Sequence, residues 1–203
     1  MPCKIAVIEY LDEVDKKALE IGAVNTIINT NGVLKGYNTD WLGAVNSLKQ
    51  KTDIKGKKVA LLGAGGAARA IAFGISHEGG QLKIFNRTVE KAEDIVGKFG
   101  GEASSLKQVA EVADCEIVIN STSVGMDSDE TPLKKEFFQK KQVVLDVVYH
   151  PWETAFLKDA KEMRAEVIYG TDMLVYQGAA QFELYTGKKA PIDVMRQAVL
   201  KNI

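Results

Sequence analysis

The chain has 203 residues, of which 46% are hydrophobic and 26% charged, and its formal net charge is −1. This composition is typical of a globular protein of one large domain or slightly more. The sequence has no basic tail or stripe that would favour nucleic acid, no apolar run that could span a bilayer and no signal-peptide core at its N-terminus. We therefore expect a cytoplasmic protein with neither a nucleic-acid nor a membrane partner.

The cysteine and histidine content argues against metal and disulfide chemistry. Cys3 and Cys115 lie far apart in the sequence and form no redox or metal-binding pattern. The two histidines, His77 and His150, have no neighbours at ligand-like spacing. We expect reduced thiols and no metal site.

The first quarter of the chain predicts a helix, a hairpin and a second helix. Apolar spacing favours a helix over about residues 4–21. Extended runs at 23–29 and 33–37 flank Thr30-Asn31-Gly32, and Asn-Gly between two such runs is a strong hairpin signal. A further helix is expected from residue 40 or 41 to about 49.

Beyond a polar segment at 50–58, strands and helices alternate. Strands are expected at 58–62, 82–86, 116–120, 142–148 and 166–169, and helices at 66–77, 88–98, 105–112, 153–163, 172–185 and 191–201. The strands are continuous apolar runs, as expected when helices cover both faces of a parallel sheet. We predict an α/β protein with a doubly wound, Rossmann-like nucleotide-binding domain over 52–170. Residues 1–51 would form part of a second domain, and the helices of 171–203 would pack back on it.

The strand at 58–62 runs into a glycine-rich turn, Gly63-Ala64-Gly65-Gly66-Ala67-Ala68. In a dinucleotide-binding turn, Gly63 would allow the sharp bend, Gly65 would let phosphates approach the backbone, and Ala68 would keep helix and strand close. Gly66 and Ala67 would begin the helix, whose N-terminal N–H groups attract an anion. A glycine turn with no ligand is the alternative that so short a pattern leaves open.

The end of the next strand predicts which dinucleotide is bound. A cofactor without a 2′-phosphate calls for an acidic residue there, whereas this chain has Asn86, Arg87 and Thr88, followed by Lys91. Two cations and a hydroxyl suit a phosphomonoester, so NADP is favoured over NAD. The alternative is a capped helix start, with Thr88 as the N-cap and both cations merely solvated.

Several further polar residues have ordinary structural interpretations when each is taken alone. Lys4 can be an exposed lysine, and Asp40 can cap the helix that follows it. The segment 120–123 can be a loop of turn residues, and Gln177 can lie on the polar face of a helix.

Taken together and in order, these residues resemble the shikimate dehydrogenase family over essentially the whole chain. The matching motifs are Pro-x-Lys at 2–4, Gly-Ala-Val-Asn-Thr at 22–26, Gly-Tyr-Asn-Thr-Asp at 36–40, Gly-Ala-Gly-Gly-Ala at 63–67, Asn-Arg-Thr at 86–88, Asn-Ser-Thr at 120–122, Asp-Val-Val-Tyr-x-Pro at 146–151 and Met-Leu-Val-x-Gln at 173–177. The resemblance implies an oxidoreductase that interconverts 3-dehydroshikimate and shikimate with NADP(H), on the route to chorismate and the aromatic amino acids.

The resemblance also implies roles for individual residues. Lys4 and Asp40 correspond to the catalytic pair, and Asn25, Asp40 and Gln177 to groups that hold substrate hydroxyls. Asn86, Arg87, Thr88 and Lys91 match the clamp on the adenosine phosphate, and Thr122, Met126, Tyr149, Gly170 and Met173 lie where the family lines the nicotinamide. The residue types fit the reaction, since a lysine can donate a proton to a developing alkoxide and a carboxylate can hold that lysine in place.

The chain departs from the family at its N-terminus. In the family, the lysine matched by Lys4 follows an α/β segment whose serines grip the substrate carboxylate, whereas here Met1 stands directly before Pro2. We expect a truncated form, a piece of a longer polypeptide, or a chain that self-associates through the surface left exposed. The functional alternatives are an NADP-binding chain without turnover, a quinate dehydrogenase that prefers NAD, and a folate-linked or amino-acid dehydrogenase that shares only the nucleotide-binding fold.

Overall fold

The larger of two sheets has six parallel strands. The computed structural model describes residues 3–202, so Pro2 of the Pro-x-Lys motif lies outside the described part. In spatial order the strands are β6 (Glu102–Ser105), β5 (Gln81–Asn86), β4 (Lys58–Leu62), β7 (Ile117–Asn120), β8 (Val143–Asp146) and β9 (Glu166–Ile168). The chain order reverses between β4 and β7. Doubly wound sheets bind ligands at the carboxyl ends of their strands at such a switch point.

Helices cover both faces of this sheet, as the apolar strands predict. Val59 and Leu61 of β4 face a core shared with α3 (Asp40–Leu48), α4 (Gly66–His77) and α5 (Val89–Phe99). Ala60 and Leu62 face the opposite core, which is shared with the 3₁₀ helix η2 (Leu106–Asp114) and α6 (Ala155–Glu162). The doubly wound α/β fold is thus confirmed.

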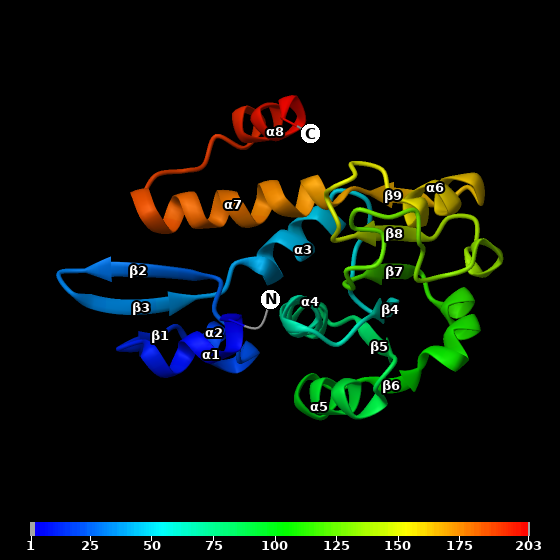
Figure 1. Ribbon diagram of the computed structural model, residues 1–203, viewed down its shortest axis with the longest axis horizontal. Helices are drawn as coiled ribbons and strands as arrows, with labels where there is room; N and C mark the ends of the chain where they lie inside the picture. The colour runs from blue at the N-terminus through cyan, green and yellow to red at the C-terminus, as the bar shows by residue number, and fades with distance from the viewer. Residues whose placement is uncertain (1–2, 203) are drawn as a thin grey trace.

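The smaller sheet has three strands in the order β1 (Glu13–Val14), β3 (Val33–Tyr37) and β2 (Thr26–Thr30). β2 and β3 form the predicted antiparallel hairpin, with Thr30 opposite Val33. The two turn residues have positive φ, 52° at Asn31 and 93° at Gly32, which is why Asn-Gly suits this turn. Figure 1 shows the hairpin projecting at the left, away from the six-stranded sheet.

The prediction of one helix over residues 4–21 is wrong. The segment forms α1 (Cys3–Ala6), the 3₁₀ turn η1 (Val7–Tyr10), strand β1 and α2 (Lys16–Ile21). The backbone N–H groups of Asp12 and Asp15 donate to Leu34 and Gly36 of β3. The Asp15 carboxylate then accepts from the N–H of Lys17 and of Ala18, and so caps a new helix. Pairing with β3 and this N-cap together outweigh the helical apolar spacing.

Two further differences have local causes. Strand β6 was not expected, because Glu102-Ala103-Ser104-Ser105 is polar and sits at the sheet edge, where Glu102 bonds the Lys83 ammonium at 2.9 Å. The helix expected at 105–112 is the 3₁₀ helix η2. A short 3₁₀ connector, η3 (Lys135–Phe137), precedes β8.

Helix α3 connects the two sheets and packs against two other helices. On one side, an added methyl group at Gly74 of α4 would lie 2.8 Å from Val45 Cγ2. On the other, a methyl group at Gly43 would lie 2.8 Å from the Met173 carbonyl oxygen in α7 (Gly170–Thr186). These contacts leave room only for glycine and bring the helix backbones close. α7 also contacts β2, whereas α8 (Ile192–Lys201) packs on α7.

Candidate active site

The glycine turn lies where β4 passes into α4. Gly63 has φ +102°, a conformation that disfavours other residues, and a side chain there would meet Thr122 Cγ2 at 2.9 Å. A methyl group at Gly65 would meet no atom within 4 Å, so this side of the turn faces open space. Gly65 caps α4 without a side-chain hydrogen bond. The first N–H groups of α4 are therefore left for an anion, which fits a dinucleotide pyrophosphate.

The predicted phosphate clamp follows β5. The Asn86 amide donates to the Thr88 carbonyl oxygen at 2.7 Å and so folds the turn back on itself. Thr88 stands at the N-cap of α5 but forms no side-chain cap bond, so the capping alternative does not account for its hydroxyl. Arg87 and Lys91 are both exposed, and their charged groups are accessible to an anion.

Lys4 and Asp40 form an ion pair across 36 residues of sequence. Lys4 Nζ lies 2.6 Å from Asp40 Oδ2, with the two side chains 23% and 4% exposed. Asp40 is the first residue of α3, and Lys4 lies on the short helix α1. A methyl group at Gly66 would lie 4.0 Å from Lys4 Cδ. The lysine stem therefore passes the N-terminus of α4, beside the glycine turn.

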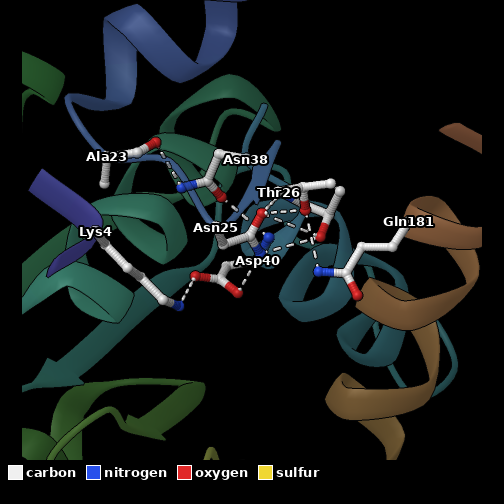
Figure 2. Close-up of polar contacts among 8 residues, drawn as sticks. Lys4, Ala23, Asn25, Thr26, Asn38, Asp40 and Gln181 are labelled. Carbon is white, nitrogen blue, oxygen red and sulfur yellow. Dashed lines mark hydrogen bonds and ion pairs between the residues drawn. The ribbon is translucent and has the colours of Figure 1, made fainter. Parts of the chain in front are cut away.

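The second oxygen of Asp40 is held by Asn25. Asn25 Nδ2 donates to Asp40 Oδ1 at 2.8 Å and to Thr39 Oγ1 at 3.0 Å. Asn25 Oδ1 accepts from the Thr39 backbone N–H at 2.9 Å. Figure 2 shows Lys4 and Asn25 reaching Asp40 from opposite sides. The carboxylate is thus fixed by a cation on one oxygen and an amide on the other.

A second buried network holds the loop that follows β7 against the glycine turn. Asn120 Oδ1 accepts from the Thr122 hydroxyl at 2.7 Å and from its backbone N–H at 3.0 Å. Asn120 Nδ2 donates to Asp146 Oδ1 at 2.9 Å. Asp146, at the end of β8 and fully buried, also accepts from Val148 N–H at 3.0 Å and from the Thr154 hydroxyl at 2.6 Å. This network sets the position of Thr122.

The stability of the protein should depend on pH through Asp146. Burial raises the pKa of Asp146 from 3.8 to about 6, against the opposing effect of hydrogen bonds from Thr154, Val148 and Asn120. The folded state therefore keeps a proton that the unfolded chain releases, and this group's contribution to stability falls as pH rises from about 4 to about 6. Because the pKa of Asp146 rises from 3.8 to about 6 on folding, the free energy of unfolding falls by at most about 3 kcal/mol over this pH range.

Asp146→Asn tests this dependence, because the amide does not titrate: its oxygen can still accept from Asn120, and its NH₂ group takes the place of the oxygen that accepts from Thr154. Urea unfolding at several pH values should show that the variant loses this part of the slope. Asp53→Asn, the same exchange at an exposed position, should keep it. An unchanged slope in Asp146→Asn would contradict the assignment.

The other residues expected around the nicotinamide differ in their exposure. Tyr149 and Met126 are 43% and 44% exposed, whereas Met173 is 6% exposed and belongs to the core that contains α3 and α4. Gly170 is packed against the backbone, since a methyl group there would lie 2.3 Å from the Val148 carbonyl oxygen. A methyl group at Gly43 would lie 3.2 Å from the backbone nitrogen of Gln177. Gly43 itself follows Asp40 by about one turn of α3.

Sequence reasoning missed several residues that build the site. The sequence motifs include Thr26, Asn120 and Asp146 without giving them a role, and Gln181 belongs to none of the motifs. The available signal was polarity at the end of an apolar strand, where a buried Asn or Asp must find hydrogen-bond partners. Gly43 and Gly74, helical glycines that permit close packing, carried no signal beyond their poor helix propensity.

The described residues offer neither a membrane span nor a metal-binding cluster. No helix within residues 3–202 has the length and apolarity needed to cross a membrane. Within the same residues, no three His, Cys, Asp or Glu side chains are grouped as a metal ion would require.

Comparison with known proteins agrees with the site geometry. The family described as "Shikimate / quinate 5-dehydrogenase" matches residues 46–145, and "Shikimate 5'-dehydrogenase C-terminal domain" matches 170–200. The NADP(+)-dependent shikimate dehydrogenase of Moorella thermoacetica is 46% identical over 208 aligned positions, which cover 96% of this chain and 70% of the relative.

Solved structures give the same result. A shikimate dehydrogenase in complex with NADP+ superposes with a TM-score of 0.94 and 39% identity, covering 100% of this chain and 75% of that one. The enzyme from Thermus thermophilus, in complex with NADP(H) and shikimate, has a TM-score of 0.93 and 36% identity, covering 100% of this chain and 77% of that one. The chain therefore belongs to the shikimate dehydrogenase family of NADP-dependent oxidoreductases.

Proposed function

We propose that this chain catalyses the reversible, NADPH-dependent reduction of 3-dehydroshikimate to shikimate, in the biosynthesis of aromatic amino acids. The observation that carries the proposal is the 2.6 Å contact of Lys4 with Asp40 beside the N-terminus of α4. It brings a proton donor next to the turn that would hold the cofactor. The proposal divides the chain into substrate-domain residues 1–51, an NADP-binding domain at 52–170 and C-terminal helices at 171–203.

The residues at the carboxyl edge of the large sheet fit NADP along its length. Gly63, Gly65, Gly66 and Ala67 would hold the pyrophosphate, Asn86, Arg87, Thr88 and Lys91 the adenosine phosphate, and Thr122, Met126, Tyr149, Gly170 and Met173 the nicotinamide end. The open side of Gly65 and the uncapped start of α4 support this placement. When bound, NADPH supplies the hydride that reduces the ketone.

Lys4 would serve as the proton donor in the reduction. Hydride addition to a ketone leaves an alkoxide, which an ammonium group can stabilise and then protonate. Asp40 holds Lys4 Nζ at one oxygen, so the ammonium is oriented before the substrate arrives. In the reverse direction, neutral Lys4 would remove the hydroxyl proton of shikimate. This pair would thus be the acid and base of the reaction.

Asn25, Asp40 and Gln177 would bind the substrate hydroxyls. Both amide hydrogens of Asn25 are already used, on Thr39 and Asp40. A substrate hydroxyl that accepts from Asn25 would therefore replace one of these bonds, and Thr39 Oγ1 is the neutral partner that is easier to exchange.

The direct test supplies the purified chain with shikimate and NADP+ and follows formation of reduced nicotinamide. Turnover with shikimate and NADP+ supports the proposal. Binding of NADP+ without turnover, from a folded sample, would favour a chain that only binds the cofactor. The name of the matched family also includes quinate, so faster turnover with quinate and NAD+ would favour a quinate dehydrogenase.

The proposal extends to self-association and to a cytoplasmic location. Tyr10, Leu19 and Val33, from the segment that carries the small sheet, are 77%, 60% and 45% exposed, and exposed apolar surface favours association. Cys3 and Cys115 are free thiols, which supports a reducing compartment.

Sedimentation velocity tests the self-association. We expect the apparent mass to rise with protein concentration, and Leu19→Lys to reduce that rise because it places a charge in the contact. Leu200→Lys, at an exposed apolar position on α8, is the matched control. A monomer over the whole concentration range would contradict this part of the proposal.

A further inference from the structure

We propose that Thr26 and Gln181 are positioning residues for the catalytic pair, acting through Asn25 on Asp40. The inference rests on the proposed function and adds to it two residues whose hydrogen bonds reach the catalytic pair only through Asn25. Gln181 Nε2, on α7, lies 3.0 Å from Thr26 Oγ1, and Thr26 Oγ1 lies 2.8 Å from Asn25 Oδ1. Figure 2 shows this line of contacts running from Gln181 through Thr26 and Asn25 to Asp40.

The direction of every hydrogen bond in this line is fixed by its neighbours. The Thr39 backbone N–H can only donate, so the atom of Asn25 that faces it must be the carbonyl oxygen. The Asn25 amide nitrogen consequently faces Asp40, whose carboxylate can only accept. Asn25 is thereby held in one of its two amide orientations.

The same logic extends to Gln181. Because the Thr26 hydroxyl meets the carbonyl oxygen of Asn25, it must give its single proton to that oxygen. Only lone pairs of Thr26 then remain for Gln181, which must present its NH₂ group. Each residue therefore donates a hydrogen bond to the next: Gln181 to Thr26, Thr26 to Asn25, and Asn25 to Asp40. The other oxygen of Asp40 accepts from Lys4.

This arrangement can hold its geometry because two of its four residues are buried. Thr26 is 2% exposed and Asp40 3% exposed, so water competes poorly for these bonds. Gln181 lies one helical turn after Gln177, the proposed substrate ligand on α7. One helix would therefore bind substrate through Gln177 and orient the acid–base pair through Gln181.

Variants at Thr26 test the first link. Thr26→Val has nearly the same shape but lacks the hydroxyl, and we expect kcat with shikimate and NADP+ to fall about tenfold, because small misplacements of catalytic groups are costly. The KM for NADP+ should not change. Thr26→Ser keeps the hydroxyl and should restore kcat. Thr30→Val, the same exchange at the exposed end of β2, is the matched control.

Variants at Gln181 test the direction of the bonds. Gln181→Met removes the donor but leaves Thr26 free to donate to Asn25, so a small loss of kcat is expected. Gln181→Glu has the shape of glutamine, yet its carboxylate accepts and draws the Thr26 proton away from Asn25. It should therefore lower kcat more than Gln181→Met does. Gln197→Met and Gln197→Glu, at an exposed glutamine on α8, are the matched controls.

A second readout does not depend on turnover. The side-chain amide resonances of Asn25, followed by ¹⁵N NMR, should shift in Thr26→Val and Gln181→Glu and stay in place in Thr30→Val. Unchanged resonances, or unchanged kcat in both Thr26→Val and Gln181→Glu, would overturn the inference. A parent chain without turnover would contradict the proposed function instead, and the resonances alone would then decide the role of Thr26 and Gln181.

Discussion

Lys4→Ala is expected to lower kcat for shikimate oxidation by about 10²–10⁴-fold while leaving the affinity for NADP+ nearly unchanged. The alanine variant has no group to exchange a proton with the substrate oxygen. It also leaves Asp40, which is 3% exposed, without its cation in the site. Cofactor affinity should persist, because the proposed phosphate contacts come from the glycine turn and from the end of β5. Steady-state kinetics, together with fluorescence titration of NADPH, separates the two effects.

Lys51→Ala is the matched control for this experiment. Lys51 is exposed just after α3, so its loss should leave both quantities unchanged. Normal turnover in Lys4→Ala would remove Lys4 from the mechanism. Parallel loss of turnover and of NADPH binding would instead assign Lys4 to the cofactor site, because a methyl group added at Gly66 would lie 4.0 Å from Lys4 Cδ.

Replacing both Arg87 and Lys91 with glutamine is expected to weaken NADP+ binding by about 10²-fold and to leave NAD+ binding almost unchanged. Each cation would lose a charge-assisted contact with the 2′-phosphate, and such contacts are each worth about 1.5 kcal/mol or more. NAD+ lacks this phosphate, so the two affinities should converge. Calorimetric titration with both cofactors measures the ratio.

Lys98→Gln provides a control on the same helix. Lys98 is exposed on the last turn of α5, so its replacement removes the same kind of charge away from the proposed clamp. If NADP+ and NAD+ affinities fell equally in the double variant, the clamp would be wrongly assigned. A fall of the same size in Lys98→Gln would attribute the effect to net charge.

The fold was predictable wherever a local pattern decides local structure. The helix predicted over 66–77 matches α4, Gly66–His77, because a glycine turn, an alanine-rich segment and a following Gly-Gly mark both ends. The hairpin at Thr30-Asn31-Gly32 followed from the left-handed backbone that its turn requires. The doubly wound sheet followed from apolar strands that alternate with helices.

The sequence could not show structure that depends on distant partners. Residues 4–21 have helical spacing, yet Asp12 and Asp15 bond the backbone of β3 much further along the chain, at Leu34 and Gly36. The ion pair of Lys4 with Asp40, and its distance from Gly66, also depend on tertiary packing. Residue types suggested the chemistry of Lys4 and Asp40, but they gave no sign of a role for Thr26 or Gln181, since threonine and glutamine are common on any polar surface.

Helix α3 has a consequence for how the protein opens. Its buried residues Trp41, Val45 and Leu48 belong to the same apolar core as Val59 and Leu61 of β4, although the prediction from sequence assigned α3 and β4 to different domains. Amide hydrogens of α3 should therefore exchange with solvent as slowly as those of β4, in one cooperative unit. The amide hydrogens of the β2–β3 hairpin should exchange faster than those of α3 and β4. Asp40 would then keep its place at the start of α3 during the local openings that admit a substrate.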